Sequence, residues 1–250
     1  MVMDANEQIK GDKEAEMISI DAKKYNHIVF FTGAGMSAES GVPTYHGQGG
    51  IWSQYNWEDY ACQTAFENDP QKVLEFHEVR RRAVLSCNPH AGHQTIADLE
   101  RSHPQVTVVT QNIDGMHHRA GSQRVIELHG SLWRLRCGCQ DPREDTGENF
   151  KSYRCGSCGE WLRPDIIWFG DALKPEVVAA AISAIGACDL FISVGTSGVV
   201  WPAAGFPEHA TQAGARCVEI NPEATEFSGI YDDTIREPAG SALPALFGQV

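Results

Sequence analysis

Four cysteines occur in two close pairs, Cys137-Gly138-Cys139 and Cys155-Gly156-Ser157-Cys158, with fifteen residues between them. Two such pairs are typical of a tetrahedral zinc site, in which four thiolates leave no open position for a substrate. The sequence therefore predicts a structural Zn²⁺ ion. The alternative is four reduced thiols without a metal, although exposed free thiols in a polar loop would be open to oxidation.

A glycine-rich stretch, Gly33-Ala34-Gly35, follows the apolar run from His27 to Phe31. Together with Ala38 it has the spacing of a turn that brings backbone N–H groups and a helix N-terminus against a pyrophosphate. We expect a buried strand, this turn, and a helix that begins near Ser37. The motif is short, so a tight turn without a ligand stays open as an alternative.

Polar and small residues end or follow three further apolar runs, Val106–Thr110, Leu190–Thr196 and Arg216–Asn221. In open α/β sheets, ligands bind at the carboxyl ends of the strands. Each group alone is also explained by turn chemistry, which favours the same residue types. Their joint occurrence favours a ligand site. The residues are Gln111, Asn112 and Asp114, then Gly195, Thr196 and Ser197, then Glu219 and Asn221.

His129 ends another apolar run, directly before the cysteine-rich segment. A histidine at a strand end beside a ligand site is a candidate general base. A lone histidine there is more often structural, so both interpretations stand at this point. His90 and His93 lie three residues apart at an expected helix start, where we interpret them as capping or packing residues.

The elements that must position these residues alternate between apolar runs and helical patterns, which indicates an α/β fold with a mostly parallel, Rossmann-like sheet. Two insertions break the alternation and together predict a small domain, a helical module over 47–88 and a zinc-ribbon module over 131–163. Residues 25–46, 89–130 and 164–250 are predicted to form the Rossmann domain, and residues 1–24 a polar lead-in.

Composition narrows the possible partners. The chain has 250 residues, of which 42% are hydrophobic, and a net charge of −13. This charge argues against nucleic-acid binding, which needs a basic face. No apolar run approaches the roughly 20 residues of a membrane helix, so we expect no membrane association. Eight cysteines without an export signal favour a reducing compartment, and we expect a cytoplasmic protein.

Seven motifs in order make the chain similar to the sirtuins, the NAD-dependent protein-lysine deacylases, and closest to the class that includes desuccinylases. The resemblance runs from Tyr25 to Phe247. It implies a Rossmann domain that binds NAD, a zinc-bearing small domain, and acyl-lysine proteins or peptides as substrates that enter the cleft between them. The motifs are GAGMSAESGVP, TQNIDGMH, ELHGSLW, the cysteine pairs, LRPDIIWFGD, VGTSGVVWPAA and EINPE.

The resemblance also assigns roles to single residues. It implies His129 as the catalytic base, with Asn112 and Asp114 orienting the ribose and nicotinamide. The implied cofactor residues are Gly33, Ala34, Gly35, Ser37, Glu39, Tyr45, His46, Gln111, Asn112, Ile113, Asp114, Gly195, Thr196, Ser197, Asn221 and Ala239. The implied substrate residues are Trp57, His77, Arg80, Trp168, Phe169 and Gly170, and the implied zinc ligands are Cys137, Cys139, Cys155 and Cys158.

The chemistry that the resemblance implies transfers the acyl group from lysine to ADP-ribose. The acyl oxygen attacks the ribose carbon as nicotinamide leaves, in a cleft that excludes water. His129 then takes a proton from a ribose hydroxyl. The products are free lysine, nicotinamide and an O-acyl-ADP-ribose.

The chain departs from the family pattern at positions that bear on the substrate. Tyr45-His46 stands where Phe-Arg is usual in the cofactor loop, and His77-x-x-Arg80 stands where acidic-acyl members have Tyr-x-x-Arg. His77 and Arg80 share a helix face and could still bind an acid, unless Arg80 belongs to a solvated charge run. The bulky ring of Trp57, another implied substrate residue, could reshape the acyl pocket. We therefore expect an acyl preference altered from plain desuccinylation.

Other functions on the same fold are an NAD glycohydrolase, an ADP-ribosyltransferase and a non-catalytic NAD-sensing module. Nicotinamide release without an acylated peptide would indicate the first two. The presence of Asn112, Asp114 and His129 together favours the deacylase.

Overall fold

The computed structural model describes residues 18–45 and 50–248. Its main sheet has six parallel strands in the order β3-β2-β1-β7-β8-β9. The chain winds outward in both directions from the centre, which is the strand order of a Rossmann fold. The strands are β1 (Ile28–Thr32), β2 (Val106–Thr110), β3 (Val125–Glu127), β7 (Leu190–Val194), β8 (Arg216–Ile220) and β9 (Asp233–Ile235).

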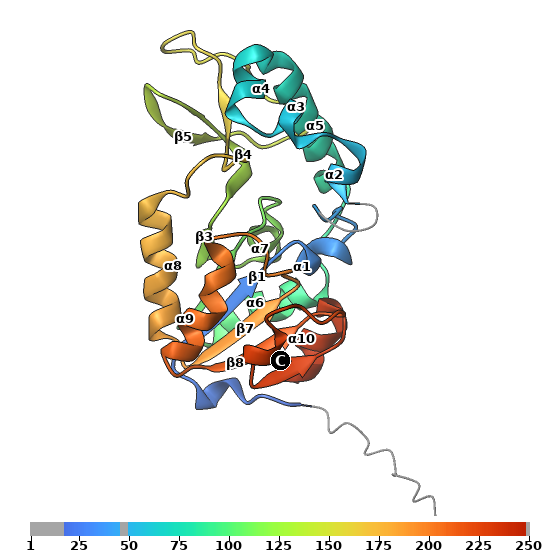
Figure 1. The fold of residues 1–250 in the computed structure, drawn as a ribbon, viewed down its shortest axis with the longest axis vertical. Coiled ribbons are helices and arrows are strands. Elements are labelled where there is room, and N and C mark those ends of the chain that lie inside the picture. Colours follow the sequence, from blue (N-terminus) through green and yellow to red (C-terminus); the bar gives the residue numbers. More distant parts are fainter. Residues whose placement is uncertain (1–17, 46–49, 249–250) are drawn as a thin grey trace, which may run out of the picture.

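Helices cover both faces of this sheet (Figure 1). Ile28 and Phe30 of β1 pack in one apolar cluster with residues of α6 and α10. Val29 and Phe31 pack in a second cluster with residues of α8 and α9. Alternate side chains of a strand point to opposite faces, so a continuous apolar run is what a strand covered on both sides needs. The helices are α6 (Ala91–Ser102), α7 (Met116–Ala120), α8 (Pro175–Ala187), α9 (Phe206–Gln212) and α10 (Ala239–Phe247).

A second lobe carries its own core (Figure 1). Three strands form an antiparallel sheet in the order β5-β4-β6, and four helices pack with it. The predicted α/β fold with a small inserted domain is therefore confirmed. The elements are β4 (Gly130–Cys137), β5 (Gln140–Glu144), β6 (Arg163–Ile166), α2 (Ile51–Gln54), α3 (Trp57–Tyr60), α4 (Gln63–Asn68) and α5 (Pro70–Leu85).

The division of the chain into numbered segments stays a prediction. β6 pairs with β4 in the small sheet, so it lies across the predicted boundary at residue 164. Of the predicted lead-in, the described part holds a short 3-10 helix, η1 (Ala22–Lys24). The remaining 3-10 turns are η2 (Ala203–Gly205) and η3 (Ser228–Ile230).

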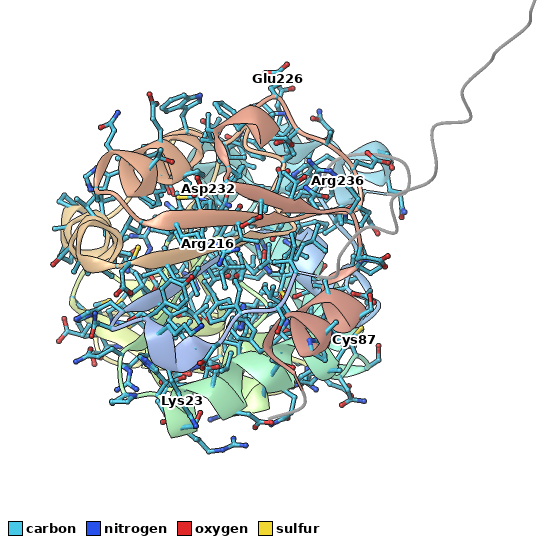
Figure 2. All side chains as sticks on the ribbon, turned by 90° about the horizontal axis from the view of Figure 1, so that it is seen from below. Lys23, Cys87, Arg216, Glu226, Asp232 and Arg236 are labelled. Atoms are coloured by element: carbon cyan, nitrogen blue, oxygen red, sulfur yellow. The ribbon has the colours of Figure 1, made fainter. Side chains whose placement is uncertain are left out.

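Side chains fill the space between the layers, while polar groups such as Lys23 and Glu226 lie at the periphery (Figure 2). In the part of the chain that the structure describes, helices long and apolar enough to cross a bilayer are absent. The ligand end of the sheet is set by its topology. Strand order reverses between β1 and β7, and the crevice above the carboxyl ends of such a pair is where doubly wound sheets bind ligands.

Candidate functional site

Three glycines let two loops touch at this crevice. Gly33 and Gly35 follow β1, and Gly195 follows β7 with a φ of 60°. The N–H of Gly35 donates to the carbonyl of Gly195 at 2.8 Å. A Cβ on Gly195 would lie 2.3 Å from the nitrogen of Met36, and one on Gly33 would lie 2.7 Å from the oxygen of Gly195. The glycines are therefore required by close backbone contact and, at Gly195, by a left-handed conformation.

The helix after the first glycine turn, α1 (Gly35–Ala38), begins within two residues of the predicted start near Ser37. Gly33 and Ala34 form the turn, and the N–H groups at the start of α1 lie beside the crevice.

A cavity of about 1020 Å³ opens above these loops and reaches into the small lobe. It brings together most of the predicted site residues, from both lobes. Those that line it are Gly33, Ala34, Gly35, Tyr45, His77, Arg80, Gln111, Asn112, Ile113, His129, Trp168, Phe169, Gly170, Gly195, Thr196, Ser197 and Asn221.

Hydrogen bonds hold the polar side chains at the floor of the cavity. The Asn112 amide donates from Nδ2 to the carbonyl of Gly33 at 2.9 Å, and its backbone N–H donates to Thr110 Oγ1 at 3.0 Å. Gln111 Nε2 donates to Thr196 Oγ1 at 2.9 Å, and Asn221 Nδ2 donates to the carbonyl of Thr196 at 3.0 Å. The polar groups that follow β2, β7 and β8 are thus joined across the sheet edge, and their orientation is fixed before a ligand arrives.

Asp114 lies in a smaller pocket next to the main cavity, together with Ala34, Tyr45, Arg80, Asn112 and Ile113. Its Oδ1 accepts the N–H of Met116 at 2.8 Å, and its carbonyl accepts Nε1–H of Trp133 at 2.7 Å. Burial raises the pKa of the Asp114 carboxyl, opposed by the hydrogen bonds from Met116 and Ser37. A buried carboxyl held in place in this way is suited to accept a hydrogen bond from an amide.

His129 presents one ring nitrogen to the cavity. Its Nδ1 lies 2.9 Å from the carbonyl of Gln111, which can only accept, so Nδ1 carries the proton and Nε2 has the free lone pair. Burial lowers the pKa of the His129 imidazole from its ordinary value of 6.5, opposed by the bond to Gln111. The ring is therefore neutral at pH 7 and able to take a proton at Nε2.

The end of the cavity in the small lobe is formed by His77 and Arg80 of α5. His77 Nδ1 donates to the carbonyl of Val73 at 2.8 Å, and Trp168 Nε1 donates to His77 Nε2 at 3.4 Å. Burial lowers the pKa of His77 to about 3, so the ring is neutral. Arg80 Nη2 donates to the Tyr45 hydroxyl at 3.0 Å, and its guanidinium lies 5.0 Å from the centroid of that ring.

The segment after β6 runs along the cavity and pairs with the small lobe through an isolated bridge between Phe169 and Cys62. Phe169 N–H donates to the carbonyl of Ala61 at 3.0 Å, and Trp168 N–H donates to Asp171 Oδ2 at 3.0 Å. Trp57 stands at the outer side, with its ring centroid 4.6 Å from that of the exposed Phe169. Predicted substrate residues 168–170 and 57 thus lie side by side, with Trp57 beside the lining rather than in it.

Two predicted cofactor residues lie outside the cavity lining, and a third lies behind it. Glu39 accepts the N–H of Gly240 at 2.7 Å, and Ala239 is buried beside Gly92. Ser37 is buried behind Asn112, whose Nδ2 lies 3.4 Å from Ser37 Oγ. His46 falls outside the described residues. The structure therefore gives Glu39 and Ala239 a role in joining helices, at some distance from the cavity.

Several lining residues were not assigned a role from the sequence. They include Trp52 of α2 and the exposed run Val199, Val200 and Trp201, whose last side chain is 68% exposed. The run could have been found by its composition, because three apolar residues follow a Ser-Gly turn at a strand end and so have no strand or helix to be buried in. Trp52 carried no such signal, since it lies in an aromatic-rich helical segment.

The four cysteines come together as predicted, with their sulfur atoms all within 4.8 Å of one another. Cys137 Sγ lies 3.2 Å from Cys139 Sγ and 3.4 Å from Cys155 Sγ. Tetrahedral Zn²⁺ with Zn–S bonds of about 2.3 Å separates its thiolates by roughly 3.8 Å. The donor set and its spacing therefore fit a closed structural zinc site, and the cluster lies outside the cavity lining.

Known proteins match along nearly the whole chain. A profile of the Sir2 family matches residues 33–202. The NAD-dependent protein deacylase 2 of Pyrobaculum aerophilum is 45% identical over 227 residues, which are 90% of this chain and 91% of that protein. The NAD-dependent protein deacylase of Aquifex aeolicus is 39% identical, over 88% of this chain and 94% of that protein.

Solved structures match as well. A complex of a Sir2 homologue with NAD superposes with a TM-score of 0.82 at 38% identity, and covers 92% of this chain and 94% of its own. A Sir2 complex with a deacetylated p53 peptide and an acetyl ADP-ribose gives a TM-score of 0.77 at 28% identity, over 90% of this chain and 97% of its own. The fold, the profile and the identity over full-length relatives agree, and the chain belongs to the Sir2 family.

Proposed function

We propose that the protein is an NAD-dependent protein-lysine deacylase, which transfers the acyl group of a modified lysine to ADP-ribose and releases nicotinamide. The observation that carries this proposal is the neutral His129, with Nε2 free, in a cavity whose floor is a Rossmann switch point. The relatives' names and the bound ligands of their structures support the same reaction.

NAD would lie along the floor of the cavity. The turn at Gly33 and Gly35 would face the pyrophosphate, where small residues and a helix N-terminus suit an anion. Asn221 and Thr196 would hold the adenosine side, and Asp114 in its adjoining pocket would hold the nicotinamide amide. When bound, NAD supplies the ribose carbon that accepts the acyl oxygen as nicotinamide leaves.

The chain's own residues would then control the protons and the water. Nε2 of His129 takes a proton from a ribose hydroxyl, while its Nδ1–H stays on the carbonyl of Gln111. Asn112 is already held by Gly33 and can orient the ribose without moving. Ile113, Trp168 and the neighbouring aromatic rings make an apolar wall that excludes water from the reacting carbon.

The acyl preference follows from the end of the cavity on α5. His77 is neutral, and both of its ring nitrogens are engaged, so it offers no donor to an acyl carboxylate. Arg80 and the Tyr45 hydroxyl remain as donors there. We expect acetyl and other neutral acyl groups to be preferred to succinyl, with Arg80 responsible for the residual turnover of acidic acyl groups.

Two further features belong to this proposal. Cys137, Cys139, Cys155 and Cys158 would hold a structural Zn²⁺ that stabilises the small lobe. The eight cysteines, all within the described residues, are not joined in disulfides, which fits a protein of the reducing cytoplasm.

The experiment that tests the proposal is product analysis with an acetyl-lysine peptide and NAD. The expected products are free lysine peptide, nicotinamide and O-acetyl-ADP-ribose. Nicotinamide release at the same rate without the peptide would indicate the glycohydrolase instead.

A further inference from the structure

Two ionisable side chains of α5 are buried on the side of the helix that faces away from the cavity. Arg81 is 0% exposed and Glu78 is 8% exposed. Glu78 directly follows His77 in α5, and Arg81 directly follows Arg80. Both His77 and Arg80 line the cavity. Successive residues of a helix are turned by roughly 100°, so one rigid helix presents both pairs to different neighbours.

Arg81 is held by the segment between the two cysteine pairs. Its Nη2 donates to Oδ1 of Asp145 at 3.0 Å, and also to the carbonyl of the same residue. Its Nε donates to the carbonyl of Gly147 at 2.8 Å. The guanidinium lies 4.3 Å from the ring centroid of Phe150. Arg81 is therefore a buried side chain and not a solvated one, and these contacts hold its guanidinium in one orientation.

Glu78 makes the matching contact one turn earlier. Its Oε1 accepts the N–H of Phe150 at 2.9 Å, and the Tyr153 hydroxyl also hydrogen-bonds to it. Asp145 is itself 2% exposed and accepts the N–H of Lys151 at 3.2 Å. The segment from Asp145 to Tyr153 is therefore attached to α5 through two buried charged groups, and its ends lead to Cys139 and Cys155.

We propose that this buried clamp, formed by Glu78 and Arg81 of α5 with Asp145 and Phe150 of the cysteine-bearing module, positions the acyl-binding end of the cavity. The inference rests on the proposed function. A change at the clamp would rotate or shift α5, and with it His77 and Arg80. The glycine turns after β1 and β7 belong to the main sheet, so the pyrophosphate and adenosine end of the NAD site would stay as it is. Arg80 also borders the pocket of Asp114, so the nicotinamide end is not part of this separation.

The clamp separates acyl binding from binding of the ADP-ribose half of NAD, and this separation can be measured. Asp145→Asn removes the charge opposite Arg81 with little change in shape, and Glu78→Gln keeps an acceptor for Phe150 while removing its charge. Arg82→Gln is the matched control, because Arg82 is exposed and donates to Asn149 in the same segment. Zinc content, the Kd for ADP-ribose, and kcat and KM for acetyl- and succinyl-lysine peptides are measured for each variant.

We expect the two clamp variants to raise KM for the acyl peptides about tenfold and to change the succinyl-to-acetyl ratio of kcat/KM, since displaced contacts cost binding steeply. The Kd for ADP-ribose, the zinc content and kcat stay within about twofold of wild type. Arg82→Gln behaves as wild type. If Asp145→Asn does not fold, the acyl KM of Glu78→Gln alone decides whether the clamp positions the acyl-binding end.

An unchanged acyl KM in both variants would overturn the clamp, and so would a loss of ADP-ribose affinity as large as the loss of acyl affinity. Wild-type turnover is the reference. Its absence on every acyl peptide contradicts the proposed function, whereas clamp variants equal to an active wild type contradict the clamp alone.

Discussion

At the scale of single residues, the proposed chemistry depends on His129. The carbonyl of Gln111 fixes the Nδ1–H tautomer, and burial lowers the pKa of the imidazole below 6.5. A base acts in its neutral form, so a lowered pKa keeps it active in more acidic solution. A stretch of sequence can suggest such a residue but gives neither its tautomer nor its pKa, because Gln111 and the burial come from other segments.

The pH profile tests this role. We expect the acid-side pKa of kcat/KM to lie below 6.5, and His129→Ala to lower kcat by at least about 100-fold, since positioned general bases contribute on this order. The measurement is the initial rate with an acetyl-lysine peptide from pH 5 to 9. An acid limb above pH 7, or an active His129→Ala variant, would contradict the assignment.

Arg80 carries the second residue-scale prediction. Replacing it with Met removes the charge at the α5 end of the cavity while keeping an extended apolar side chain. We expect kcat/KM for a succinyl-lysine peptide to fall about tenfold relative to that for the acetyl peptide, because a charge-assisted contact is lost. Arg82→Met serves as the control, because the side chain of Arg82 donates a hydrogen bond to Asn149 at the surface. An equal decrease of kcat/KM for both peptides would contradict the role of Arg80 in binding acidic acyl groups.

At the scale of elements, the central feature is the contact between the turns after β1 and β7. Gly195→Ala would place a Cβ 2.3 Å from Met36 N at a positive φ. We expect this variant to lose about 3 kcal/mol of unfolding free energy and to bind NAD weakly. Gly156→Ala, where a Cβ meets nothing within 4 Å, is the control and should be near neutral. Urea titrations measure the unfolding free energy of both variants.

The strands that the sequence predicted best are those that are apolar on both faces. β1 is buried along its whole length, and its composition alone marks it as a covered strand. β5 was not predicted, because its residues Gln140–Glu144 are mostly exposed and include a proline. Its strand conformation depends on pairing with β4, which local composition does not encode.

The same distinction holds within the site. Strand-end groups such as Asn112 were predicted, since parallel strands bring their ends to one edge. The attachment of Glu39 to Gly240 was not, because it joins segments 201 residues apart. Likewise, the hydrogen bond from Trp168 Nε1 to His77 Nε2 was not predicted, because it joins residues 91 positions apart.

At the scale of the whole molecule, three buried histidines link folding to pH. Burial lowers the pKa of His77 and of His117 to about 3, and that of His93 to about 2. Their unfolded values are near 6.5. Between these limits the unfolded chain binds more protons than the folded one, so stability is retained above pH 6.5 and falls as pH decreases toward 3.

Each of these histidines contributes up to about 1.4 kcal/mol per pH unit to that slope. We expect the unfolding free energy from urea titrations to be flat between pH 7 and 8 and to drop markedly by pH 5. His77→Asn should reduce the slope. A stability that is constant from pH 7 to 5 would contradict the buried, neutral state of these rings.

The most direct test of the whole account is the stoichiometry of the reaction. The protein is incubated with NAD and an acetyl-lysine peptide, and nicotinamide, deacetylated peptide and O-acetyl-ADP-ribose are quantified together by mass spectrometry. The account predicts that the three form in equal amounts and that none forms when the peptide is omitted. Nicotinamide and free ADP-ribose formed without the peptide, or no turnover of any acyl peptide, would contradict it.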